Sequence, residues 1–231
     1  MNVEFKARGS RGEVWLYDQI GASFWGEGIT AKAFQKELSA LGKVTTINVH
    51  INSPGGDVFD GFAIYNQLKN HPATVEVDVD GVAASIASII AMAADPGKLR
   101  MAKNSLMMIH NPQGGDYGDE LELQRVIALL KTVRGNLADT YVDRTGNKKA
   151  DVEGWMQDET WFTAEAALQH GFADSMTAET AVTACIDVRN FRNVPEALKR
   201  RLQAASPQPV LDMRRQRIED QDKRAALLRA A

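Results

Sequence analysis

The sequence INSPGGD, residues 51–57, joins the two kinds of secondary structure that decide the fold of this chain. Apolar residues alternate with polar ones up to this point, which predicts a half-buried strand ending in it; they are Ile47, Val49 and Ile51. An acidic residue, Asp57, then opens an amphipathic run over 57–70 that predicts a helix. The stretch is therefore a turn from a strand into a helix.

This turn has unusually few side chains. Pro54 fixes one backbone angle, while Gly55 and Gly56 accept positive φ and carry no side chain that would obstruct a ligand. Such a turn can present a free backbone N–H. Most Pro-Gly-Gly turns only connect two elements, however, and the turn taken alone favours that simpler interpretation.

The composition of the whole chain indicates one globular domain with an appended tail. It has 231 residues, 44% hydrophobic and 25% charged. The apolar stretch 82–94 is too short to span a bilayer, and the N-terminal residues contain no signal-peptide core, so we expect a cytoplasmic protein without a membrane partner. The single Cys185 and the four scattered histidines predict neither a disulfide, a metal site nor a cofactor.

The charge distribution separates the tail from the main body. Residues 189–231 contain 11 Lys/Arg and 5 Asp/Glu, whereas the whole chain has a net charge of −3. We therefore expect a domain over 1–188 and a charged, partly helical extension over 189–231. Because Glu219, Asp220 and Asp222 interrupt the basic run, a solvated helix or a partner-binding arm is favoured over a nucleic-acid site.

Strand and helix patterns alternate along the main body. Strands are predicted at 13–17, 44–51, 75–80 and 105–110, and helices at 30–41, 57–70, 85–94, 119–144 and 163–170. This order predicts an α/β domain with a largely parallel sheet and right-handed crossovers. The helix over 119–144 is long for a chain of this size, so part of it is expected to project from the domain or to pack on another subunit.

Two residues follow predicted strands at positions suited to nucleophilic chemistry. Ser85 lies after the small residues 81–84, at the start of an apolar helix, where backbone N–H groups stabilise negative charge. It is either a nucleophile or simply the N-cap of that helix. His110 ends the strand SLMMIH and precedes Asn-Pro, a position compatible with a site and with a purely structural role.

Two carboxylates, Asp158 and Glu159, precede Thr-Trp-Phe at 160–162. Either could orient an imidazole, and either could be an ordinary surface charge.

Taken together and in this order, these segments resemble the ClpP serine peptidases. The motifs that carry the resemblance are INSPGGD, GVAAS (81–85), MIHNP (108–112) and the run from TGNKK to HGFAD (145–174), and the similarity extends over about 44–175. The resemblance implies the ClpP/crotonase-like α/β fold, with repeated ββα units, a mainly parallel sheet and a long protruding helix.

The resemblance also implies a role for each site residue. Ser85 corresponds to the nucleophile and His110 to its base, while the amides of Gly56 and Ile86 form the oxyanion hole. The family's aspartate aligns with Glu159, with Asp158 as the alternative acid and Asn111 as a remote third. Val82 stands where many relatives carry Gln.

The partners implied are a polypeptide substrate and further copies of the chain in a homo-oligomeric ring. No GxxxxGK[ST] phosphate loop occurs, so the serine endopeptidase that the resemblance implies is expected not to hydrolyse ATP itself. The segment before Glu13 is short and polar, so the sequence does not decide whether the chain works with an unfoldase partner. The C-terminal extension resembles that of phage and prophage head maturation (prohead) proteases, which implies capsid or scaffold proteins as substrates, in the bacterial host cytoplasm or in the procapsid.

Two alternatives of other classes remain at this point. Crotonase-type acyl-CoA enzymes share the fold and an oxyanion hole, but they need no Ser-His pair. A catalytically inert ClpP-fold assembly or scaffold subunit would retain the fold without the chemistry.

Overall fold

The computed structural model describes residues 3–22, 28–180, 191–196 and 198–200. The chain divides into two compact units, Met1–Asn193 and Val194–Ala231, and the first unit contains the elements described below. The boundary predicted between residues 188 and 189 lies outside the described residues.

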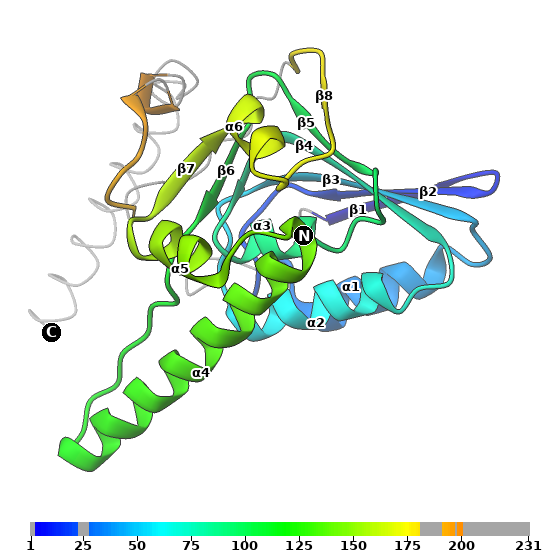
Figure 1. The fold of residues 1–231 in the computed structure, drawn as a ribbon. Coiled ribbons are helices and arrows are strands. Elements are labelled where there is room, and N and C mark those ends of the chain that lie inside the picture. The colour runs from blue at the N-terminus through cyan, green and yellow to red at the C-terminus, as the bar shows by residue number, and fades with distance from the viewer. Residues whose placement is uncertain (1–2, 23–27, 181–190, 197, 201–231) are drawn as a thin grey trace, which may run out of the picture. The chain divides into compact units, whose positions relative to one another are not determined.

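The first unit is built on a sheet that is parallel at most of its strand pairs (Figure 1). In spatial order the main path is β1-β2-β3-β4-β5-β8, while β6 pairs with β4 and β7 pairs with β6. Only the pairs β1–β2 and β6–β7 are antiparallel among those described. The predicted α/β class with a mainly parallel sheet is thus confirmed. The strands are β1 (Val3–Arg8), β2 (Arg11–Leu16), β3 (Thr46–Ser53), β4 (Thr74–Ala84), β5 (Leu99–Ala102), β6 (Leu106–Ile109), β7 (Thr160–Thr163) and β8 (Ser175–Thr177).

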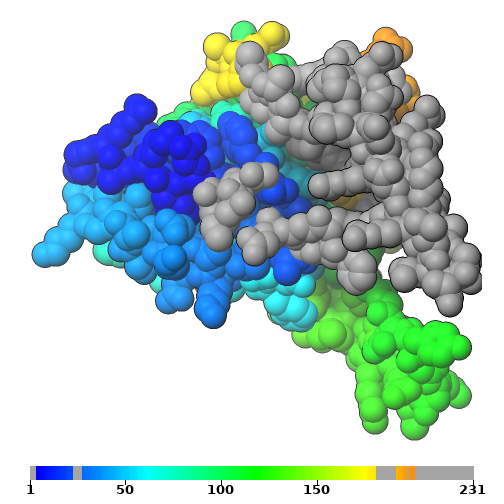
Figure 2. Space-filling model, turned by 180° about the vertical axis from the view of Figure 1, so that it is seen from behind, coloured from blue at the N-terminus to red at the C-terminus, as the bar shows by residue number. Residues whose placement is uncertain are grey.

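Helices cover the sheet and one of them leaves it. In Figure 1, α1 and α2 lie side by side along one face of the first four strands, and α4 leads away from the sheet. Viewed from behind, the N-terminal part of α4, in green, stands out beyond the blue and cyan elements (Figure 2). The helices are α1 (Ala31–Ala40), α2 (Val58–Lys69), α3 (Ile86–Ala91), α4 (Glu120–Thr145), α5 (Lys149–Gln157) and α6 (Ala164–Gln169).

Local sequence explains where α4 begins and ends. Asp119 accepts a hydrogen bond from the Glu122 N–H, and the Glu122 side chain accepts one from the Asp119 N–H, so a capping box starts the helix. Gly146 ends it in the left-handed conformation, with φ 71°. The predicted helix over 119–144 therefore forms almost as expected and protrudes.

The two faces of the sheet are buried in different ways. Ile47, Val49 and Ile51 of β3 are fully buried in the apolar core beneath the helices. On the opposite face, Arg100 of β5 donates to Asp78 Oδ1 and Oδ2 at 2.6 and 2.8 Å and to other acceptors on neighbouring strands. Polar groups on this second face are thus paired with one another, which makes their burial tolerable.

The sheet brings three of the predicted motifs to one edge. The parallel strands β3, β4 and β6 are neighbours, with Ser53 beside Ala83 and Ala84 beside Met108. Their carboxyl ends lead directly into the Pro54–Gly56 turn, into Ser85 and into His110. Ligand sites in open α/β sheets form outside such carboxyl ends. This edge is where the functional site is to be sought.

Candidate active site

Ser85 occupies a strained turn between β4 and α3. Its φ of 54° and ψ of −130° are rare for a residue with a side chain, and its own N–H donates to the Met108 carbonyl at 2.9 Å. The side chain makes no capping hydrogen bond, so Ser85 does not act as the conventional side-chain N-cap considered from the sequence. Because of this turn α3 starts at Ile86. It ends at Ala91, short of the predicted 94, since the Ala93 and Ala94 N–H groups bond three residues back, to the Ile90 and Ala91 carbonyls. The Ser85 hydroxyl is left free for another partner.

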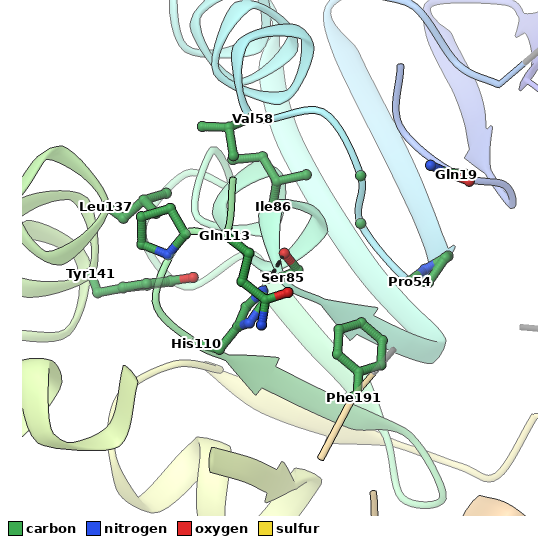
Figure 3. Close-up of a pocket in the computed structure, with 13 residues that line it drawn as sticks. Gln19, Pro54, Val58, Ser85, Ile86, His110, Gln113, Leu137, Tyr141 and Phe191 are labelled. Carbon is green, nitrogen blue, oxygen red and sulfur yellow. Dashed lines mark hydrogen bonds between the residues drawn. The ribbon is translucent and has the colours of Figure 1, made fainter. Parts of the chain in front are cut away.

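That partner is His110. Its Nε2 lies 2.8 Å from Ser85 Oγ, and Figure 3 shows the two side chains pointing toward each other. Burial lowers the pKa of His110 below its ordinary value of 6.5; the carboxylate of Glu159 opposes this shift and the guanidinium of Arg192 adds to it. The imidazole is therefore neutral near pH 7 and can accept a proton from the serine hydroxyl.

The two candidate acids differ sharply in their surroundings. Glu159 is 1% exposed and has a φ of 51°, so a strained backbone turns its side chain inward between α5 and β7. Asp158, the C-cap residue of α5, is exposed. Asn111, the third candidate, donates its backbone N–H to the Met156 carbonyl at 2.9 Å. Of the three, Glu159 has the electrostatic interaction with His110.

Glu159 is held by a segment far along the chain. Its Oε1 accepts the backbone N–H of Asn193 at 2.7 Å, and Arg192 Nε lies 3.8 Å from Oε2. Within the described part of the chain, Oε2 has no hydrogen-bond partner, and neither does His110 Nδ1. The structure thus brings Glu159 and His110 into one buried neighbourhood without a hydrogen bond between them.

The Gly-Gly turn lies against the nucleophile. A Cβ on Gly55 would meet Ser85 Cβ at 2.7 Å and the Ala84 carbonyl oxygen at 2.6 Å. A Cβ on Gly56, whose φ is 147°, would meet the Ile20 carbonyl oxygen at 2.1 Å. Both positions therefore require glycine for space as well as for conformation.

Gly56 and Ile86 both line the cavity that Ser85 lines. On either side of the Gly56 N–H, Ile20 donates to the Gly55 carbonyl and Asp57 donates to the Ile20 carbonyl, each at 2.9 Å. The Gly56 N–H donates to no group among the residues that the structure describes, and the Ile86 N–H in the first turn of α3 does not either. Two residues with unused backbone N–H groups thus line the same cavity as Ser85.

The cavity itself has a volume of about 350 Å³. Ser85 and His110 lie on its wall with Gly56, while Leu137 and Tyr141 of α4 line one side and Phe191 another (Figure 3). The Phe191 ring also lies edge-on to the His110 imidazole, with 5.8 Å between centroids. The site thus combines a polar centre with apolar walls.

Sequence reasoning missed several of these contributors. Tyr141 lies within the long helix predicted over 119–144, where an aromatic residue gives no sign of lining a site. Phe191 and Asn193 fall in the predicted extension over 189–231, and no local pattern relates them to His110 or Glu159. In the residues with described side chains, no group of His, Cys, Asp and Glu is arranged to hold a metal ion, and no helix is long and apolar enough to cross a membrane.

Ser85 is hydrogen-bonded to a neutral imidazole at the carboxyl ends of a parallel sheet, in a cavity that Gly56 and Ile86 also line. This arrangement is that of the serine hydrolases. The family model described as Clp protease matches residues 24–180. The ATP-dependent Clp protease proteolytic subunit 1 of Protochlamydia amoebophila is 38% identical over 166 residues, which cover 71% of this chain and 79% of that protein. The corresponding subunit of Streptococcus salivarius is 34% identical over 144 residues, covering 61% and 73%. The chain belongs to the Clp protease family of serine peptidases.

Family membership selects between two of the alternatives raised by the sequence. It favours the peptidase over the acyl-CoA enzyme of crotonase type. The inert scaffold subunit differs from a peptidase only in its chemistry, so experiment must separate these two.

Proposed function

We propose that the chain hydrolyses peptide bonds in polypeptides, with Ser85 as nucleophile, His110 as general base and acid, and the amides of Gly56 and Ile86 as the oxyanion hole. The observation that carries this proposal is the 2.8 Å contact between Ser85 Oγ and His110 Nε2 at the wall of a cavity that Gly56 and Ile86 also line. The neutral state of His110, favoured by its lowered pKa, supports its role as a base.

The reaction follows from these positions. Ser85 Oγ bonds to the substrate carbonyl carbon while His110 Nε2 takes the hydroxyl proton, and the carbonyl oxygen becomes an anion facing the two amides. Collapse of this intermediate breaks the C–N bond, and His110 gives its proton to the departing amine. Water then attacks the acyl-serine with His110 again as base, which releases the carboxylic acid and restores the Ser85 hydroxyl.

Glu159 is the acid that we propose for the triad. With Nε2 accepting from Ser85, the proton of the neutral imidazole sits on Nδ1, where it has no acceptor in the described part of the chain. Glu159 Oε2 is buried and lacks a donor. A rearrangement of the Glu159 side chain that joins these two atoms would satisfy both groups and would hold the imidazole in the tautomer required for catalysis.

The projecting helix suggests how copies of the chain associate. Leu121, Leu123, Ile127 and Leu129 of α4 are each at least 42% exposed, and Tyr117 just before the helix is fully exposed. Large apolar side chains exposed on a protruding helix cost solubility unless another surface covers them. We assign this part of α4 to contacts between copies in a homo-oligomer, a ring by resemblance to the family.

The natural substrate is a finer part of the proposal. Residues beyond 180 lie outside the family match, and the charged C-terminal extension resembles that of prohead proteases. We therefore propose capsid or scaffold proteins as substrates, cut in the host cytoplasm or the procapsid. Portal and major capsid genes beside the gene for this chain would support that assignment, whereas a neighbouring unfoldase gene in a housekeeping operon would contradict it.

Hydrolysis of a fluorogenic peptide library tests the reaction itself. The wild-type chain should cleave members of the library, and Ser85→Ala should lose about 10⁴-fold in turnover while folding normally. Ser105→Ala is the matched control, because it also removes a serine hydroxyl, but one that is buried and has no hydrogen-bond partner among the described residues. A wild-type chain with no Ser85-dependent cleavage would favour the inert scaffold.

A further inference from the structure

Ser88 and Tyr141 form a buried polar pair behind the nucleophile that the mechanism above does not use. We propose that they are positioning residues, which aim the Ile86 amide into the oxyanion hole through hydrogen bonds to the Ser85 carbonyl. This inference rests on the proposed function, because it concerns one of the two oxyanion donors.

The hydrogen bonds form a directed chain. Ser88 Oγ donates to the Ser85 carbonyl oxygen at 2.5 Å and lies 2.8 Å from the Tyr141 hydroxyl. A serine hydroxyl has one proton, and Ser88 gives it to a carbonyl that can only accept, so Tyr141 must be the donor to Ser88. Burial raises the pKa of Tyr141, which keeps its hydroxyl protonated for this task. The Ser88 N–H adds a second bond to the same carbonyl at 3.0 Å.

Planarity of the peptide bond transmits this anchoring to the oxyanion hole. The Ser85 carbonyl and the Ile86 N–H belong to one trans peptide unit, so their directions are opposed and fixed relative to each other. Hydrogen bonds that hold the Ser85 carbonyl oxygen on the side of the protein interior therefore point the Ile86 N–H toward the cavity. Two donors from Ser88 hold that oxygen.

The local backbone creates the need for such an anchor. Ser85 has φ 54°, a conformation that persists only where surrounding contacts enforce it. α3 has only six residues, and its first-turn N–H groups have no partners within the helix. Without the Ser88 hydroxyl, the carbonyl would lose a 2.5 Å hydrogen bond, and the peptide unit would be freer to tilt.

Tyr141 fixes the Ser88 hydroxyl from a separate element. It is 2% exposed, lies on α4 and packs edge-on against Phe172, with ring centroids 5.7 Å apart. Ser88 is fully buried on α3, where no water competes for its hydroxyl. Because both side chains are enclosed, the direction of each hydrogen bond is set by packing.

A misaimed donor should weaken the transition state more than the ground state. Loss of a complete oxyanion donor costs about 10²- to 10³-fold in kcat, so a tilted one should cost part of that. We expect Ser88→Ala to lower kcat about 10- to 100-fold and Tyr141→Phe about 3- to 10-fold, with KM within about twofold. Because Tyr141 acts through Ser88, Tyr141→Phe should add no further loss in the Ser88→Ala background.

The test combines kinetics with the affinity for a peptide boronic acid, whose tetrahedral adduct on Ser85 places an oxygen in the oxyanion hole. The affinity for the boronic acid should fall in parallel with kcat in both variants. The affinity for the peptide carboxylic acid of the same sequence, which is the cleavage product, should stay unchanged. Ser105→Ala and Tyr65→Phe, which remove a hydroxyl each from outside the cavity wall, should leave both quantities at the wild-type level. Thermal melts accompany each variant.

Each outcome then decides a different question. Wild-type kcat and boronate affinity in Ser88→Ala and Tyr141→Phe would overturn the positioning role and leave the peptidase assignment intact. Equal losses in boronate and product binding, or additive losses in the double variant, would also overturn it. If Ser88→Ala fails to fold, the isosteric Tyr141→Phe decides alone. A wild-type chain that forms no boronate adduct at Ser85 would refute the proposed function, and this inference with it.

Discussion

Replacing Gly56 by alanine separates the two interpretations of the INSPGGD turn. An added Cβ would lie 2.1 Å from the Ile20 carbonyl oxygen, which is backbone and is itself bonded to the Asp57 N–H at 2.9 Å. The turn must therefore shift, and the Gly56 N–H shifts with it. If this N–H is an oxyanion donor, Gly56→Ala should lower kcat about 10²- to 10³-fold with a much smaller change in KM.

The same substitution also costs stability, so a matched glycine is required. Backbone strain at φ 147° and the displaced contact should lower the free energy of unfolding by about 1–3 kcal/mol. Gly97 has φ 77° with no atom within 4 Å of an added Cβ, so Gly97→Ala should cost about 1 kcal/mol through conformation alone.

Steady-state kinetics on the folded fraction, beside a thermal melt of each variant, distinguishes the outcomes. Gly97→Ala should keep wild-type kcat per folded subunit, whereas Gly56→Ala should not. A destabilised Gly56→Ala with wild-type turnover per folded subunit would refute the role of this amide and reduce the turn to a connector.

Three further predictions concern the acid, the base and the polar face of the sheet. Glu159→Gln should cut turnover about 10²-fold or more while Asp158→Asn stays near wild type; the reverse ranking in a kinetic assay would transfer the role to Asp158. The acid limb of kcat/KM should lie below pH 6.5, because His110 must lose its proton to act as base and its pKa is lowered by burial; a limb above pH 6.5 would argue against His110. Arg100→Met should lower the free energy of unfolding by about 2 kcal/mol in urea melts, since it strands partly buried carboxylates, whereas Lys149→Met, which breaks an exposed pair, should change nothing measurable.

Local patterns were sufficient to predict the elements that carry the central part of the site. The alternation at Ile47, Val49 and Ile51 and the bare turn after it determine β3 and the entry to α2, and both depend only on neighbouring residues. Ser85 and His110 come together because each follows a strand of one parallel sheet, so their proximity follows from topology once the strands are recognised.

Short or mixed segments could not be predicted in the same way. β5, β7 and β8 have only three or four residues each, too few for periodicity to show, and α5 buries only Val152 and Met156. Their formation depends on pairing and packing with distant parts of the chain.

The surroundings of Glu159 could not be predicted from local sequence either. The inward turn of Glu159 depends on a positive φ that nothing in the sequence DET indicates. Its hydrogen bond with the Asn193 backbone joins residues 34 positions apart, and a backbone donor has no signature in the side-chain sequence. The alignment with the family aspartate was therefore the only argument available for preferring Glu159 to Asp158.

The central claim is that Ser85 is an activated nucleophile. The most direct test is to treat the chain with a fluorophosphonate and to locate the adduct by mass spectrometry. We predict stoichiometric modification of Ser85, slowed by orders of magnitude in His110→Ala and absent in Ser85→Ala. Failure of the wild-type chain to react, or modification of a different serine, would contradict the account.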